Sequence, residues 1–392
     1  MKPFDSGCCG GSVEQGKISG SLLIQPSMEE FKKTEAPIDP LKDHDKPGYR
    51  LCSFVRGFLK TDVGLIPRVK TDLDKSDLLS TVMIRAGIKR HDYRISPGLY
   101  AVGTPDKYSE VLVTANFKLT FDHLRRELNG LSAWILVLDT NGVNVWCAAG
   151  KKTFSTHELV NRIKTVSLSE LVTHGRVIVP QLGATGVSAV EVKKRSGFEV
   201  VFGPVRAKDI PLFLRNNRKA DERMRTVTFS FFERLILTPV ELKLIVKPVL
   251  ITAIVLFVIS GIGPGLFSIS QAGSRGLAAV FFLFAGILSG AVITPTFLPF
   301  IPFREFAAKG IISGGIFAAV ASIFFSPPMA GTTALMGLSL LTVTSSSILA
   351  MQFTGATPFT SPSGVEKEMR RFIPAQAVGL LSATGLWIYS AF

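Results

Sequence analysis

Charged side chains and cysteines are scarce in this sequence of 392 residues. Only 19% of the residues are charged and 47% are hydrophobic, and the mean hydropathy of +0.34 is more apolar than that of an ordinary soluble enzyme. Four cysteines are too few for a small domain held together by disulfides. The hydrophobic content excludes a chain that is disordered throughout. The length predicts two or three domains, of which at least one is strongly apolar.

The charges that are present are mainly basic and unevenly distributed. Lys and Arg total 44 against 30 Asp and Glu, a net charge of +14, which raises nucleic acid or an anionic membrane as a partner. Only seven of the basic residues and three of the acidic ones follow Lys243. The basic part lacks the interleaved aromatic side chains that stack nucleic-acid bases, so we expect no nucleic-acid partner.

Five apolar runs follow residue 243. They cover about residues 244–262, 276–294, 307–325, 330–351 and 373–392. Each run of roughly 20 residues is long enough, as a helix, to span a hydrocarbon core of about 30 Å. Because a lipid interior satisfies backbone polar groups only within a helix, the runs predict an all-α domain of five transmembrane helices over residues 244–392.

A transporter with a cytoplasmic regulatory domain is one interpretation of these runs. They contain few ionisable residues, however, with Lys247 and Lys309 close to their edges, and buried charges normally mark an ion path. Membrane anchoring is therefore favoured. Loops 295–306 and 352–372 carry basic residues, and positive-inside bias places them and the first part of the chain in the cytoplasm, with the C-terminus outside.

The part of the chain before the apolar runs divides into three segments. Residues 1–50 are rich in Gly, Ser, Pro, Lys and Asp and predict a flexible tail. They lack the apolar segment of a signal peptide, which fits a cytoplasmic location with reduced thiols in a multi-pass protein of the cytoplasmic membrane. Residues 51–220 predict a folded domain, and residues 221–243 a linker helix next to the membrane.

Apolar runs alternate with helical stretches in residues 51–220. We expect strands at 111–115, 134–138, 177–179 and 199–202. We expect helices near 120–129, 156–166, 187–194 and 209–217, the second opened by a capping box at 155–158. This alternation predicts a parallel sheet covered by helices on both faces, an α/β Rossmann-like domain.

Ligands in such sheets bind where strands lead into helices, at the carboxyl ends of the strands. The rule selects loops 114–116, 139–142, 181–186 and 203–207 as the candidate site. These loops contain neither a GxGxxG dinucleotide fingerprint nor a GxxxxGK[ST] phosphate loop, which disfavours an NAD enzyme or an NTPase.

A short helix with one cysteine follows the second of these loops. Asn144 is a predicted N-cap and Gly150 a predicted C-terminal stop, which places Cys147 in the first turn. The helix dipole there, with the charges of Lys151 and Lys152, favours a thiolate that can hold a soft metal. By spacing alone, a small buried hydrophobe is the favoured interpretation of Cys147, because a single cysteine in an apolar stretch is usually part of the core. The five histidines have no metal-ligand spacing, and His123 and His157 are predicted on helix surfaces without a role.

Residues 144–151, NVWCAAGK, resemble the cap-helix motif of the corrinoid protein of the bacterial mercury-methylation pair. The segments VLVTANFKLTFDHLRREL, WILVLDTNGVNVWCAAGKKTF, VIVPQLGATGVSAVEVKKRSGFEVVFGPVRA and FTGATPFTSPSGVEKEMRRF also look like that family, as does a tail of five membrane helices. The domain before the membrane helices is similar, in addition, to the corrinoid-binding domain of the large subunit of the acetyl-CoA-pathway corrinoid iron–sulfur protein.

The resemblance implies a cobalt-containing corrinoid of the cobalamin type. Cys147 matches the motif cysteine that ligates cobalt from below. The residues that match the cap helix or lie in loops expected to line the corrinoid are Thr114, Asn116, Thr120, Asn144, Val145, Trp146, Ala148, Gly150, Lys151, Gly183 and Ala207. The implied activity is a corrinoid-dependent methyltransferase that passes a methyl group from methyl–Co(III) to Hg(II) and forms methylmercury. A second interpretation keeps the corrinoid but has another one-carbon acceptor.

The resemblance also implies partners. The methyl donor would be methyltetrahydrofolate or its carrier protein, and the reductant a ferredoxin-like protein with two [4Fe-4S] clusters. This chain cannot hold such a cluster, because Cys8, Cys9, Cys52 and Cys147 lack the required spacing. Loop 352–372 is a candidate docking surface for the reductant or an ordinary polar loop. Cys8 and Cys9 are candidate Hg(II) ligands or part of a tail without a role, and Cys52 is predicted in the core.

Overall fold

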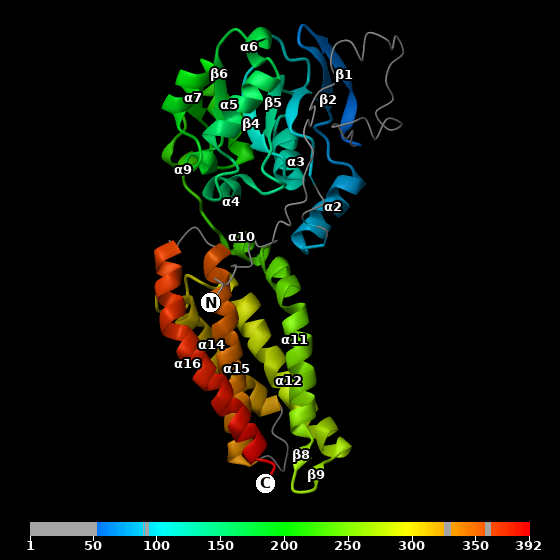
Figure 1. Ribbon diagram of the computed structural model, residues 1–392, viewed down its shortest axis with the longest axis vertical. Helices are drawn as coiled ribbons and strands as arrows, with labels where there is room; N and C mark the ends of the chain where they lie inside the picture. Colours follow the sequence, from blue (N-terminus) through cyan, green and yellow to red (C-terminus); the bar gives the residue numbers. More distant parts are fainter. Residues whose placement is uncertain (1–52, 89, 91–93, 325–330, 357–361) are drawn as a thin grey trace. The chain divides into compact units, whose positions relative to one another are not determined.

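The computed structural model describes residues 53–392, apart from residues 89, 91–93, 325–330 and 357–361 (Figure 1). The described chain forms two compact units. Residues 53–84 and 88–227 make up the α/β unit, and residues 228–392 make up the helical unit. The predicted tail at 1–50 lies outside the described residues, and so do Cys8, Cys9 and Cys52.

The α/β unit contains seven strands and a set of short helices. The strands are β1 (Val55–Thr61), β2 (Gly64–Val69), β3 (Gly98–Val102), β4 (Val111–Ala115), β5 (Ala133–Leu138), β6 (Arg176–Val179) and β7 (Glu199–Phe202). The helices are α2 (Lys75–Arg85), α3 (Lys118–Glu127), α4 (Val145–Gly150), α5 (Thr156–Thr165), α6 (Leu168–Leu171), η1 (Gln181–Gly183), α7 (Ala189–Ser196), η2 (Ala207–Asp209), α8 (Ile210–Arg215) and α9 (Glu222–Arg225).

The strands form one sheet in the order β1-β2-β3-β5-β4-β6-β7. The four strands expected from the sequence, β4 to β7, are all present and parallel to one another. The sheet as a whole is mixed, because β1 pairs antiparallel with β2 and β3 pairs antiparallel with β5. A connection as short as residues 62–63 permits only antiparallel pairing, so the expectation of a purely parallel sheet is wrong for this edge.

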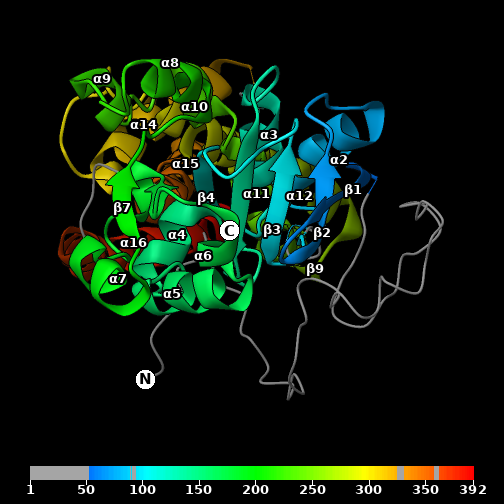
Figure 2. The ribbon, with the colours of Figure 1, turned by 90° about the horizontal axis from the view of Figure 1, so that it is seen from above.

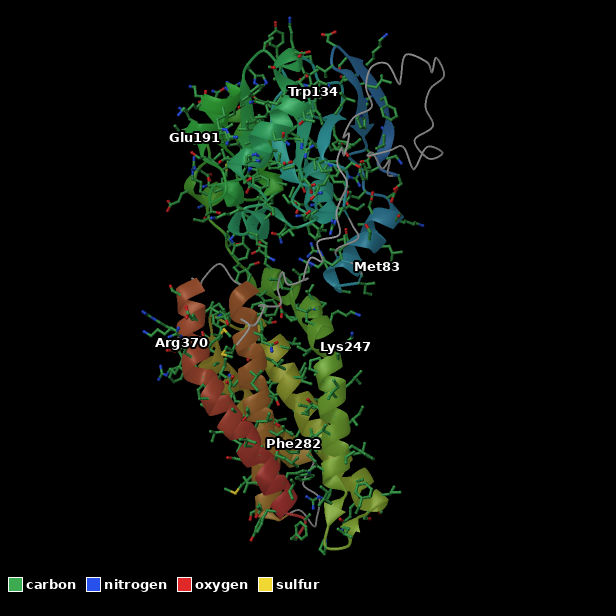
Figure 3. All side chains as sticks on the ribbon, in the orientation of Figure 1. Met83, Trp134, Glu191, Lys247, Phe282 and Arg370 are labelled. Carbon is green, nitrogen blue, oxygen red and sulfur yellow. The ribbon has the colours of Figure 1, made fainter. Side chains whose placement is uncertain are left out.

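Helices cover both faces of the sheet. Figure 2 shows α5, α6 and α7 on one side, with α3 and α8 on the other. Alternate residues of β5 enter the two apolar cores: Trp134 and Leu136 pack with α5, and Ile135 and Val137 pack with α3 and α8. Trp134, labelled in Figure 3, is only 1% exposed. Burial on both faces explains why this strand is a continuous apolar run in the sequence.

A buried ionic network fixes α3 against α2. Arg125 donates to Asp77 at 2.7 Å and to Asp122 at 2.8 Å, and the Lys118 ammonium contacts the same two carboxylates at 2.8 and 2.5 Å. Arg125 also donates to the carbonyl of Lys70 at the end of β2. Asp77, Asp122 and Arg125 are buried. The network therefore determines where α3 lies on its face of the sheet.

The helical unit begins after residue 227. Its elements are α10 (Phe231–Leu235), α11 (Thr238–Ser260), the β8 (Ile262–Gly263) and β9 (Leu266–Phe267) hairpin, α12 (Ile269–Ile287), the π-helical turn η3 (Leu288–Ile293), α13 (Thr294–Thr296), α14 (Phe306–Phe324), α15 (Thr332–Gln352), η4 (Phe353–Ala356) and α16 (Pro362–Tyr389). Among the residues that the structure describes, five helices are long and apolar enough to cross a membrane, as the sequence predicts. The spans are Phe231–Ser260, which joins α10 and α11; Ile269–Thr296, which joins α12, η3 and α13; Phe306–Phe324, which is α14; Thr332–Gln352, which is α15; and Ser363–Tyr389, which is α16 without its first residue.

Small residues bring these helices close together. A Cβ on Gly310 of α14 would lie 2.7 Å from the carbonyl oxygen of Ser346 of α15. The Ser346 hydroxyl donates to the Gly310 carbonyl at 2.7 Å and lies 3.0 Å from the hydroxyl of Ser289. Backbone contact of this kind is how helices pack tightly where no hydrophobic effect drives them together. Phe282, labelled in Figure 3, is among the fully buried side chains of this bundle.

Two expectations for the connecting segments are wrong. Segment 221–243 is not one helix: it contains α9, α10 and the start of α11. The chain is extended at Thr226, and Phe229 has a φ of 44°, so a continuous helix is interrupted there. Loop 352–372 is also shorter than expected, because η4 occupies its start and α16 begins at Pro362, a residue that suits the first turn of a helix.

The two lysines near the apolar runs lie in different surroundings. Lys247 on α11, labelled in Figure 3, is exposed. Lys309 on α14 is 7% exposed, and its ammonium donates to the carbonyls of Leu298, at 2.7 Å, and Ile301. Lys309 therefore satisfies backbone carbonyls at the end of the bundle.

Candidate functional site

A cavity of about 350 Å³ opens at the carboxyl ends of β4 and β6. The chain runs from β4 to β5 on one side of β4 and returns to β6 on the other side. A parallel sheet opens a crevice at such a reversal, and this is where ligands bind in doubly wound folds. The position agrees with the edge selected from the sequence.

The cavity walls are mostly apolar. Its lining comprises Leu112, Val113 and Thr114 of β4, Thr120, His123 and Leu124 of α3, Asn144, Val145 and Trp146 at the start of α4, Ile178, Pro180 and Leu182 around the end of β6, and Gly203, Pro204, Val205, Ala207 and Ile210 after β7. Apolar walls with a few polar groups are typical of a pocket for an organic ligand or cofactor.

The short helix α4 forms part of one wall. Asn144 is its N-cap, as predicted, and its side chain accepts a hydrogen bond of 2.9 Å from the Cys147 amide. Val145, Ala148 and Ala149 are buried in the core, while Trp146 is 38% exposed. Cys147 is half-buried between these two sides of the helix. The helix ends at Gly150, but the left-handed residue that turns the chain is Lys152, with a φ of 62°.

The predicted site residues divide into two groups. Thr114, Thr120, Asn144, Val145, Trp146 and Ala207 line the cavity. Asn116, Cys147, Ala148, Gly150, Lys151 and Gly183 are not among the lining residues. Ala148 is buried on the core side of α4, and Gly150 and Lys151 are exposed at its C-terminal end. Cys147 directly follows three lining residues in the chain.

The loop after β6 supports α4 from behind. A Cβ on Gly183 would lie 2.5 Å from the ring of Phe154, which is fully buried. A Cβ on Gly186 would collide with the Phe154 carbonyl and approach Ala149 of α4 at 3.1 Å. These two glycines are therefore required for the close packing of the loop against α4.

His123 is a lining residue that the sequence does not identify. It is half-buried on α3, whereas His157 is exposed as predicted. The expectation of a surface position for His123 is therefore wrong. Thr120 and His123 are three residues apart on one helix face, so the assignment of Thr120 to the site could also have selected His123.

The capping box expected at 155–158 is half formed. The Ser155 hydroxyl accepts from the Glu158 amide at 3.2 Å. The Glu158 carboxylate does not complete the box, because it accepts from the Asp139 amide at 3.0 Å and pairs with Arg162 at 2.6 Å. Glu158, on α5, thus holds the loop that precedes α4 through the Asp139 amide.

Comparison with known proteins places this cavity in a region of detectable similarity. The model of the CO dehydrogenase/acetyl-CoA synthase delta subunit family matches residues 68–214. Every residue that lines the cavity lies within this range, and the helical unit lies outside it.

Several curated proteins are similar over the same part of the chain. The gamma subunit of the acetyl-CoA decarbonylase/synthase complex of Methanocaldococcus jannaschii is 29% identical over 150 residues, which are 37% of this chain and 30% of that protein. The corrinoid/iron-sulfur protein large subunit of Moorella thermoacetica is 31% identical over 126 residues, 32% of this chain and 28% of that protein. The chain thus spans less than a third of the length of these two relatives.

Proposed function

We propose that this protein is a membrane-anchored corrinoid methyltransferase in which a Rossmann-like domain holds the cofactor in the cavity and Cys147 is the lower cobalt ligand. The observation that carries the proposal is the coincidence of the cavity with the region similar to corrinoid-protein subunits. The five apolar helices supply the anchor, with the α/β unit on the cytoplasmic side.

The residues present fit a corrinoid. The cavity offers apolar walls to the faces of a large macrocycle, and Thr114, Thr120, His123 and Asn144 offer polar groups to its amide side chains. The helix that contributes to the wall carries a soft sulfur donor, which suits a transition metal. When bound, the corrinoid supplies the methyl-transfer chemistry.

The protein residues orient the cofactor and tune its reactivity. Asn144 caps α4 and orders the turn that carries Cys147. Trp146, which is 38% exposed, contributes an aromatic side chain to the cavity wall. A Cys147 thiolate donates more electron density than water or an imidazole does. Held by this thiolate, a bound corrinoid would supply methyl-transfer chemistry suited to a soft electrophile.

Hg(II) is the acceptor that we propose, because it is a soft electrophile and because residues 144–151, NVWCAAGK, resemble the cap-helix motif of mercury-methylation corrinoid proteins. A ferredoxin-like protein with two [4Fe-4S] clusters would supply electrons, and methyltetrahydrofolate or its carrier protein would supply the methyl group. A second candidate is a corrinoid carrier for another one-carbon acceptor. The names of the relatives, a subunit of an acetyl-CoA decarbonylase/synthase complex and the large subunit of a corrinoid/iron-sulfur protein, favour this alternative.

Absorption spectroscopy of the full-length protein tests the cofactor. We expect protein purified in detergent from cells supplied with cobalamin to show the visible bands of a bound corrinoid, and a colourless preparation would refute the proposal. Conversion of HgCl₂ to methylmercury, measured with the reductant partner against a panel of other methyl acceptors, then separates the two candidates. If the protein prefers a different methyl acceptor, mercury is excluded as the acceptor, but the assignment of a corrinoid cofactor stands.

A further inference from the structure

The side chain of Asn116 lies at the end of β4 but does not face the cavity. It is 3% exposed, and its Oδ1 accepts three hydrogen bonds from the loop that follows β5: from the Thr140 amide at 3.0 Å, the Thr140 hydroxyl at 2.8 Å and the Gly142 amide at 2.9 Å. Its Nδ2 donates to Asp139 at 3.0 Å. One carboxamide thus makes four hydrogen bonds to residues 139–142.

The loop that Asn116 holds is a tight turn. Asn141 and Gly142 both have positive φ values, 56° and 72°, and the Val143 amide donates to the Thr140 carbonyl at 3.1 Å. Asn-Gly is the preferred central pair of such a type I′ turn, so the sequence itself favours this conformation. The position of the turn is fixed by Asn116 on one side and by Glu158, which accepts from the Asp139 amide, on the other.

The held loop leads directly into α4. Only Val143 separates Gly142 from Asn144, whose side chain caps α4 at the Cys147 amide. The Thr140 hydroxyl lies 2.7 Å from the Val143 carbonyl as well, so its single proton is shared between that oxygen and Asn116 Oδ1, which links the loop to the residue before the cap. The position of residues 139–142 therefore determines where α4 starts in space.

We infer that Asn116 is a positioning residue that determines where α4 presents Cys147. This inference deepens the proposed function, since it assigns to the end of β4 a role in orienting the thiol rather than in touching the corrinoid. An asparagine is required because one side chain must both accept from the loop amides and donate to Asp139. Groups that orient a ligand from behind commonly change metal affinity or activity by about 10- to 100-fold.

Hydrogen exchange of the cofactor-free full-length protein measures this role without any corrinoid. With Asn116→Leu we expect the amides of Cys147 and Ala148 to exchange at least about tenfold faster, and Cys147 to be alkylated at a changed rate. Amides of α7, and the matched variant Asn161→Leu on the exposed face of α5, should show no change. Unchanged exchange at α4 in Asn116→Leu overturns the inference.

A paired substitution covers the case in which Asn116→Leu does not fold. Asn116→Asp keeps the three accepting contacts but places a second carboxylate beside Asp139, so we expect faster exchange at α4. Combining it with Asp139→Asn restores one donor and one acceptor at that contact, and exchange should return toward the wild-type rate. If the pair exchanges like Asn116→Asp alone, the assigned hydrogen bonding is wrong.

Cofactor spectra distinguish a failure here from a failure of the proposed function. In the corrinoid-loaded protein, we expect Asn116→Leu to lose the absorption features that Cys147 contributes while retaining bound corrinoid. A wild-type protein without corrinoid refutes the proposed function but leaves the exchange result intact. If the corrinoid-loaded Asn116→Leu variant has the same absorption spectrum as the wild type, the positioning role is overturned.

Discussion

Arg125 of α3 forms a buried ion pair with Asp77 of α2, with the guanidinium nitrogen 2.7 Å from the carboxylate. Burial by itself would raise the pKa of Asp77, but the hydrogen bonds and charges of Lys118 and Arg125 outweigh it and hold the pKa below its ordinary value of 3.8. Because α3 carries Thr120 and His123, this pair supports one wall of the cavity from a position outside it.

Asp77→Asn should destabilise the protein in a pH-dependent way. At pH 7 the substitution leaves the Arg125 charge buried with only one carboxylate, a loss of roughly 3–5 kcal/mol. The folded pKa of Asp77 is below the unfolded one, so its stabilisation is complete above about pH 4 and is lost as the pH falls through the folded value. We therefore expect Asp77→Asn to unfold at a lower temperature than the wild type at pH 7. The difference between the two unfolding midpoints should become smaller as the pH is lowered to 3.

The matched control for that series is Glu127→Gln on α3, the helix that carries Arg125. Glu127 pairs with Arg126 at the surface, where an ion pair contributes about 1 kcal/mol or less. Its midpoints should follow those of the wild type at every pH. An Asp77→Asn protein that melts like the wild type at pH 7 would show that the network does not support α3.

Cys147→Ala should lower methyl transfer by roughly 100-fold or more while membrane insertion is retained, because the proposed cobalt ligand is lost and the helical unit is untouched. The measurements are methylmercury formation and the protein content of the membrane fraction. Cys52→Ala, which removes a different thiol, should retain activity. Full activity in Cys147→Ala would remove the ligand assignment.

His123→Ala should weaken corrinoid binding by about three- to tenfold, the effect of one lost hydrogen bond of about 1 kcal/mol. Titration of cobalamin into cofactor-free protein, followed by absorbance, gives the dissociation constant. His157→Ala is the matched control, since His157 is also helical but exposed and away from the cavity. Equal affinities for the two variants would exclude His123 from the binding surface.

Gly310→Ala should loosen the contact between α14 and α15, because the new methyl group would lie 2.7 Å from the Ser346 carbonyl. Overpacking of this kind costs about 1–3 kcal/mol and should lower the temperature of unfolding in detergent. Gly315→Ala on the same helix meets no atom within 4 Å and should leave that temperature unchanged. Equal melting of both variants would contradict the tight packing.

The parallel strands and α4 could be predicted because their sequences encode them locally. A strand buried on both faces is a continuous apolar run, as in β5, and Asn144 marks a helix start by its side chain alone. β1 and β2 were missed because VRGFLKT and GLIPRV mix polar, Gly and Pro residues with apolar ones. Strands of this composition, β1 at the edge and β2 beside it, are defined by their pairing, which a single sequence does not display.

The candidate site was harder to predict than the fold. Asn116 follows a strand that leads into the site, yet its carboxamide binds a loop 23 or more residues further on. His123 has the polarity of a surface residue, but β4 and the start of α4 form a cavity around it. Both outcomes depend on how separate elements pack in space, which local periodicity does not specify.

Lys309 bears on the transporter interpretation through its two backbone partners. Its ammonium occupies the carbonyl oxygens of Leu298 and Ile301, the type of oxygen that coordinates permeating cations in channels. A resident positive charge at these oxygens repels any second cation that approaches them. With Lys309 in place, these two carbonyls are not available to coordinate a transported cation at this end of the bundle.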